Sequence, residues 1–329
     1  MNITVTPATP ASSTPIRLLL DPWSADYPAS IHAEDGESEL GDFQVETAVE
    51  TAHWSAIPPG QPPDSAAFVD GVRRLEPRVV GLRPEGIVHG LFASFGTGAT
   101  IVMPGSASFV ACRTARRLIL TAGLVRQETL RAGNCDLVFE ALATPAANPA
   151  DLLLALQGAM REAEWALARA MASPIVFLDG PLAYVTEPPG PVVGVIKSIH
   201  RLYLDSGQME LAVRLRTGER TPVFAIREGR KTRYSWYLRI AERRPIHHGF
   251  SGVIRLEASA AAGISAAVAL AGMSAGWLPR FASSANRDPR APQNLTPVGA
   301  LEQHLRNQLG DATIIQRAIE RRISEGLLL

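Results

Sequence analysis

The same phrase occurs twice in the chain: residues 66–71 read AAFVDG and residues 175–180 read IVFLDG. In each, an apolar run is followed by Asp and Gly, which indicates a buried strand that emerges at the edge of a sheet. Glycine lets the backbone turn and lets a ligand approach closely. If the two strands lie side by side, Asp70 and Asp179 meet at one edge. Carboxylates that close repel each other and favour a divalent cation between them, although either Asp-Gly alone could simply form a turn.

The rest of the pattern alternates strands with helices. We expect helices at 148–172, where apolar residues recur at helical spacing, and at 258–278 and 298–323. The uncharged stretch 258–278 consists mostly of Ala, Ser and Gly, so we interpret it as a helix packed inside the protein, not a membrane span. The expected further strands are 16–20, a meander over 78–95 and 99–112, then 192–196, 209–215, 223–226, 234–240 and 253–256. This order predicts an α/β or α+β fold around one central sheet.

Composition and charge narrow the class of protein. Of the 329 residues, 46% are hydrophobic and 19% charged, which suits a folded core and excludes a disordered chain. With 2 cysteines there is no disulfide framework, and we expect a reduced, cytoplasmic protein with no membrane association. Residues 1–70 hold eleven acids against one base, and the remainder has 31 bases and 21 acids, which favours a polyanionic ligand. We therefore predict an acidic, Pro-rich segment at 1–63, ending in PPGQPP, and a main domain at 64–329.

Two further side chains could complete a metal site. The helix that precedes the second Asp-Gly carries Glu162 and Glu164, and Glu164 lies beside its apolar stripe. His304 borders the apolar face of the last amphipathic region, where a buried, hydrogen-bonded histidine is the alternative. No zinc-protease, Walker A or nucleophile-elbow phrase occurs in the chain.

A basic stretch points to nucleic acid. Residues 227–244, REGRKTRYSWYLRIAERR, carry seven bases and two acids with aromatic residues between them. Cationic side chains can follow phosphates while aromatic faces stack on bases, as in single-strand binding. The candidate contacts are Arg230, Lys231, Arg233, Tyr234 and Trp236, with Arg73 and Arg74 beside the first Asp-Gly. Alternation along the strand predicts a buried Tyr237, and the competing interpretation is a hairpin whose aromatic residues enter the core.

Taken in order, these phrases resemble the NurA nuclease family, the DNA-end-processing partners of the HerA hexameric ATPase. The matching pieces are FVDGVRRLE at 68–76, the Glu-bearing helix at 151–171, VFLDGPL at 176–182, VVGVIK at 192–197 and TPVGALEQHLR at 296–306. The resemblance implies an RNase H-like fold, a central mixed sheet flanked by helices, to which this chain adds the acidic segment. It also implies a manganese site made of carboxylates and a C-terminal histidine, which here would be Asp70, Glu164 (or Glu162), Asp179 and His304.

The implied activity is metal-dependent hydrolysis of DNA, as a single-strand endonuclease and 5′–3′ exonuclease in end resection, repair or defence. Imidazole is a softer ligand than carboxylate, so His304 would favour Mn²⁺, with Mg²⁺ also possible. The family further implies a homodimer docked on a HerA-type ATPase ring. Two alternatives remain open at this point: a non-catalytic DNA-binding or scaffold subunit, and an RNase H-like hydrolase acting on another nucleic acid.

Overall fold

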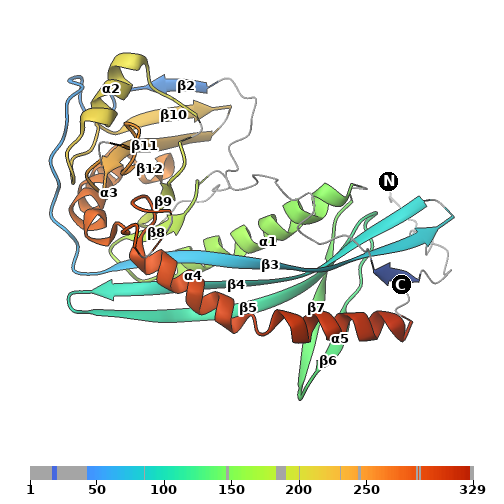
Figure 1. Ribbon diagram of the computed structural model, residues 1–329. Coiled ribbons are helices and arrows are strands. Elements are labelled where there is room, and N and C mark those ends of the chain that lie inside the picture. The colour runs from blue at the N-terminus through green and yellow to red at the C-terminus, as the bar shows by residue number, and fades with distance from the viewer. Residues whose placement is uncertain are drawn as a thin grey trace, which may run out of the picture.

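The computed structural model describes residues 17–20, 43–84, 86–145, 148–182, 190–199, 201–229, 231–243, 246–286, 288 and 290–326. These residues form one twelve-stranded mixed sheet in the order β2-β10-β11-β12-β9-β8-β3-β4-β5-β7-β6, with β1 paired to β3 (Figure 1). The strands are β1 Leu18–Leu20, β2 Phe43–Glu46, β3 Ala66–Arg83, β4 Gly86–Met103, β5 Ser106–Leu120, β6 Glu128–Ala132, β7 Cys135–Ala143, β8 Val176–Asp179, β9 Val192–Ile196, β10 Phe224–Glu228, β11 Lys231–Arg239 and β12 Val253–Ser259. The fold is thus a large mixed α/β sheet flanked by helices.

The centre of the sheet is an antiparallel meander followed by parallel strands. Long strands β3, β4 and β5 pair antiparallel, while β8 pairs parallel to β3 and β9 parallel to β8. The pairing of Val69 with Leu178 brings Asp70 level with Asp179, as the repeated phrase predicts. Only β8 ends there, however. β3 continues past Gly71 to Arg83, because the residues after Gly71 remain paired with β4.

Helices cover both faces of this centre (Figure 1). The helical elements are α1 Pro149–Ala170, α2 Ser206–Arg214, η1 Ala260–Ala262, α3 Ile264–Trp277, η2 Leu278–Phe281, α4 Thr296–Gln308 and α5 Ala312–Ser324. Along β3, Ala67 and Val69 pack in the cluster that includes Ala168 of α1. Phe68 packs with the α3 and α4 side chains, and Val72 packs on Leu301 of α4. Strand alternation therefore directs Asp70 toward α4 and Gly71 toward α1.

Residues 43–63 lie against the main domain, and β2 is the one named strand among them. β2 pairs with β10 at its edge. The buried Arg220 donates two hydrogen bonds to the carboxylate of Glu50, at 2.7 and 2.8 Å. Gly60 lies against Gly272 of α3 so closely that a Cβ on Gly60 would be 2.9 Å from its backbone. Most of the acidic segment, residues 1–16 and 21–42, lies outside the described residues.

Two expected elements differ in the structure. Residues 209–215 are not a strand, because α2 begins at a capping box in which Asp205 and Gln208 satisfy each other's backbone N–H groups. The stretch 258–278 begins as the end of β12, passes through the short helix η1 and becomes α-helical at α3, which packs on the sheet as expected of a small-residue helix. Among the described residues, no helix is long and apolar enough to cross a membrane.

Candidate metal centre

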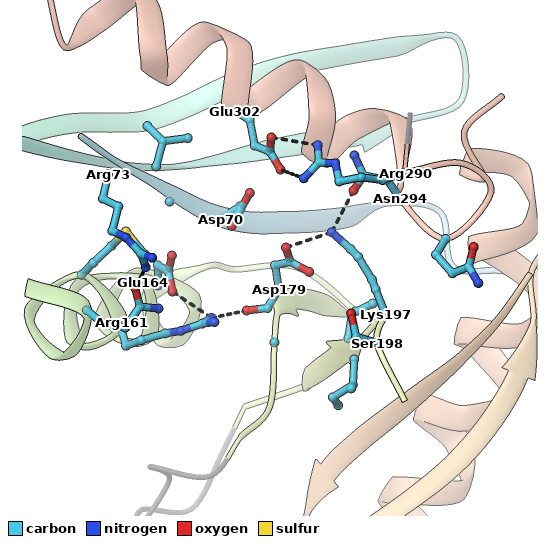
Figure 2. A pocket seen from close by; sticks show the side chains of 18 of the residues that line it. Asp70, Arg73, Arg161, Glu164, Asp179, Lys197, Ser198, Arg290, Asn294 and Glu302 are labelled. Atoms are coloured by element: carbon cyan, nitrogen blue, oxygen red, sulfur yellow. Dashed lines mark hydrogen bonds and ion pairs between the residues drawn. The ribbon is translucent and has the colours of Figure 1, made fainter. Parts of the chain in front are cut away.

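Three carboxylates from three elements converge at the point where β3 and β8 lie side by side. Asp70 of β3, Asp179 at the end of β8 and Glu302 of α4 each place one oxygen within 4.8 Å of the others (Figure 2). Asp70 and Glu302 are buried, with 6% and 5% of their surface exposed. Burial, together with the charges of Asp179, Glu164 and Glu302, holds the pKa of Asp70 well above its usual range. Such a group of oxygens suits a hard divalent cation.

Glu164 lines the same cavity from the opposite face of the sheet. It occupies a position in the buried stripe of α1, one turn after Met160 and one turn before Ala168. The approach depends on Gly71, since a Cβ there would lie 2.5 Å from Oε1 of Glu164. Burial, opposed by Arg161 and reinforced by the charge of Asp179, raises the pKa of Glu164 to about 7.

One oxygen of Glu164 has no hydrogen-bond partner among the described residues. Oε2 accepts a hydrogen bond from Arg161 at 3.3 Å, whereas Oε1 is fully buried without any hydrogen bond. A buried carboxylate oxygen without a partner costs free energy unless a ligand satisfies it. This oxygen, beside the three-carboxylate group, is the observation that fits a bound cation.

Cationic side chains surround the carboxylates. The centre lines a cavity of about 560 Å³ whose wall holds four carboxylates and five basic side chains. The basic residues are Arg73, Arg161, Lys197, Arg290 and Arg306. Lys197, directly after β9, donates 2.8 Å hydrogen bonds to Asp179 Oδ2 and to Asn294 Oδ1 (Figure 2). A cation held by carboxylates inside a basic wall is an arrangement suited to a phosphate ester.

Three of the four residues expected as ligands line this cavity, and the fourth does not. Asp70, Asp179 and Glu164 line the cavity, and Glu162 is exposed on α1. His304 is not part of the group: it lies two residues, about 200° of helix, beyond Glu302. Its ring stacks on Phe109 of β5, with the centroids 4.5 Å apart. The α4 side chain at the centre is therefore a carboxylate, not an imidazole.

The aromatic face expected to bind a nucleic-acid strand, Tyr234 and Trp236 of β11, lies in or against the core. Trp236 is fully buried and donates a 3.2 Å hydrogen bond to Ser274 of α3, so it offers no surface to a base. Tyr234 is partly buried and packs against the same cluster. Tyr237 is fully buried, as expected. The prediction of an aromatic stacking platform here is wrong, because β11 lies between β10 and β12 with a helix over this face.

The basic residues expected to bind nucleic acid lie in different places, and one of them lines the cavity. Arg73 lines the cavity, where it hydrogen-bonds Gln157. Arg74 instead pairs with Glu76 and donates to the Gly310 carbonyl just after α4. Arg233 forms ion pairs with Glu228 and with the buried Glu257. Lys231 is exposed on β11, away from the cavity lining, and Arg230 lies outside the described residues.

Sequence reasoning missed Glu302, Lys197, Arg290 and Asn294. A signal existed for Glu302, which lies four residues after Val298 and three before Leu305, both buried. Lys197 had a weaker signal, its position directly after a strand parallel to β8. Arg290 and Asn294 come from the segment between η2 and α4, which has no periodic pattern.

Comparison with known proteins gives distant likenesses only. No protein-family model and no curated protein sequence matches the chain. Among solved structures, the chain is similar to the NurA nuclease from Sulfolobus solfataricus, with 13% identity over 83% of this chain and 86% of that one, at a TM-score of 0.43. A structure of NurA with manganese matches 39% of this chain and 22% of that one, with 15% identity and a TM-score of 0.18. Because these likenesses are distant, the chemistry of the cavity follows from its own side chains.

Proposed function

We propose that the chain is a divalent-metal-dependent nuclease that hydrolyses phosphodiester bonds in the cavity at the end of β8. The observation that carries the proposal is the unpartnered, buried Oε1 of Glu164 beside the group formed by Asp70, Asp179 and Glu302. These four carboxylates would hold the cation. When bound, it would supply Lewis acidity at a phosphoryl oxygen and charge balance for the departing oxygen.

The protein's own cations would position the substrate. Arg73 and Arg306 are exposed at the cavity, where they can bind the phosphates on either side of the scissile one. Arg161 donates a hydrogen bond to the backbone carbonyl of Asp179 and another to Glu164, so it fixes two of the carboxylates relative to each other. Lys197 holds Asp179 from the other side.

The finer assignments are also part of the proposal. The order of the five central strands, a meander of three followed by two strands parallel to the first, supports an RNase H-like sheet. DNA as the substrate, a homodimer and docking on a HerA-type ATPase are supported by the ordered sequence motifs. Because Glu302 replaces an imidazole at the centre, the donor set is all oxygen, and we propose that Mg²⁺ serves as well as Mn²⁺.

A substrate panel tests this function. Labelled single-stranded DNA, blunt duplex DNA and single-stranded RNA are incubated with the full chain in Mn²⁺, in Mg²⁺ and in EDTA. We expect DNA cleavage with either cation and none in EDTA. Cleavage of RNA alone would replace the substrate assignment, and no cleavage of any strand with either cation would overturn the proposal. Co-purification with a HerA-type ATPase and the mass in solution test the partner and the dimer separately.

A further inference from the structure

Arg290 makes a two-pronged contact with a carboxylate of the proposed metal centre. Its Nη1 and Nη2 donate to Oε1 and Oε2 of Glu302, each at 2.9 Å (Figure 2). Arg306, one turn further along α4, donates to Oε2 at 3.2 Å. Three guanidinium N–H groups thus use three of the roughly four lone-pair positions that a carboxylate offers.

A divalent cation and this guanidinium compete for Glu302. The cation needs an oxygen lone pair of Glu302, and its positive charge repels the guanidinium that already holds both oxygens. The side chain of Arg290 is 52% exposed, so it has room to move outward, whereas that of Glu302 is 7% exposed. When Glu302 binds a cation, the exposed side chain of Arg290 therefore moves more readily than the buried carboxylate does.

Arg290 is anchored at Asp288 by both its side chain and its backbone. Its Nε and Nη2 contact the Asp288 carboxylate at 3.3 and 3.4 Å. Its backbone N–H donates to Oδ1 of Asp288 at 2.8 Å. Asp288 also accepts a hydrogen bond from Asn294, which is fully buried and accepts one from Lys197. A displaced guanidinium would therefore remain at the cavity wall. A fork of N–H donors at that place matches the two oxygens of a phosphate.

We propose that Arg290 is exchanged between Glu302 and a substrate phosphate, so that divalent cation and nucleic acid bind cooperatively. This inference rests on the proposed function. In this exchange Glu302 would pass from Arg290 to the cation and Arg290 would pass to the phosphate, so that each ligand frees a side chain that the other needs. Because coupling free energies are reciprocal, each ligand raises the affinity for the other by the same factor.

The test measures Mn²⁺ binding, not cleavage. Free Mn²⁺ is followed by electron paramagnetic resonance in a titration of the full chain, with and without a short phosphorothioate DNA strand that resists hydrolysis. For the unaltered protein we expect the DNA to tighten Mn²⁺ binding on the order of fivefold, the scale of one partly exposed charge pair. Arg290→Gln should bind Mn²⁺ more tightly without DNA, by a similar factor, and should lose the effect of DNA.

Arg73→Gln is the matched control, because it removes one positive charge from the same cavity wall while Arg73 contacts Gln157 instead of Glu302. Because Arg73 is itself proposed to bind a phosphate, the comparison is made at a DNA concentration that saturates Arg73→Gln, and there the variant should keep the effect of DNA on Mn²⁺ binding. Arg290→Lys keeps the charge but lacks the paired N–H donors of the guanidinium, so it should weaken that effect. This variant replaces Arg290→Gln in the test if Arg290→Gln does not fold. Equal Mn²⁺ affinity and equal coupling in Arg290→Gln and the unaltered protein would overturn the exchange alone. Failure of the unaltered protein to bind Mn²⁺ would overturn the metal centre itself.

Discussion

Replacing Glu164 by Gln should stabilise the protein in the absence of divalent cations, and only above acidic pH. The pKa of Glu164 is raised from 4.5 to about 7 in the folded protein. Between these values the folded state holds a proton that the unfolded state has lost, so the free energy of unfolding falls as pH rises. The contribution of Glu164 to the free energy of unfolding is fully present below pH ~4.5 and is lost above pH ~7.

The size of this loss follows from the shift. A difference of roughly 2.5 between the two pKa values corresponds to at most ~3 kcal/mol. Glu164→Gln removes the ionisation while it keeps the shape of the side chain and an acceptor for Arg161. We therefore expect the variant to match the unaltered protein at pH 4.5 and to be more stable by up to ~3 kcal/mol at pH 8.

Urea unfolding in EDTA at both pH values measures the effect. Glu162→Gln, an exposed position two residues away on α1, is the control and should match the unaltered protein throughout. Saturating Mn²⁺ should then stabilise the unaltered protein more than Glu164→Gln, because a ligand that binds only the folded state adds its binding free energy. A Glu164→Gln variant no more stable than the unaltered protein at pH 8 would refute the raised pKa of Glu164.

Four other substitutions have defined outcomes. Trp236→Ala should lower the free energy of unfolding by ~3–5 kcal/mol in urea, yet leave the DNA affinity of the folded protein unchanged in anisotropy titrations; weaker DNA binding without a stability loss would restore a stacking role. Glu302→Gln should weaken Mn²⁺ binding in calorimetry whereas His304→Ala should not, and the reverse result would return the imidazole to the centre. Gly71→Ala should also weaken Mn²⁺ binding, because its Cβ would lie 2.5 Å from Oε1 of Glu164; an unchanged affinity would show that Glu164 is not a ligand.

Much of the centre could be predicted from local sequence because its key positions follow strand and helix periodicity. Asp70 and Asp179 occupy equivalent places in two parallel neighbours, so their meeting follows once the strands pair. Glu164 interrupts an apolar stripe of α1 at a buried position, which local spacing alone can identify. The choice of Glu164 over Glu162 came from the same spacing.

The rest depends on contacts between distant segments. An Asp-Gly pair indicates a turn locally, but 18-residue β4 keeps β3 extended beyond Gly71. The basic hairpin contains cationic and aromatic residues of the kind that bind nucleic acid. Trp236 nevertheless lies in the core, because α3 packs over β11. For α4, the sequence motif predicted the helix but not which of its faces is buried. The packing of Val298 and Leu305 turns Glu302 inward instead of His304.

The most direct test of the metal-dependent nuclease is the rate at which the full chain cleaves single-stranded DNA in saturating Mn²⁺, measured beside Asp70→Asn purified in the same way. Asn keeps the size of the side chain but removes the charge at a buried member of the three converging carboxylates. We predict cleavage by the unaltered protein that stops on addition of EDTA, and none above background from Asp70→Asn. Cleavage that persists in EDTA, or at the unaltered rate in Asp70→Asn, would contradict the assignment of this centre.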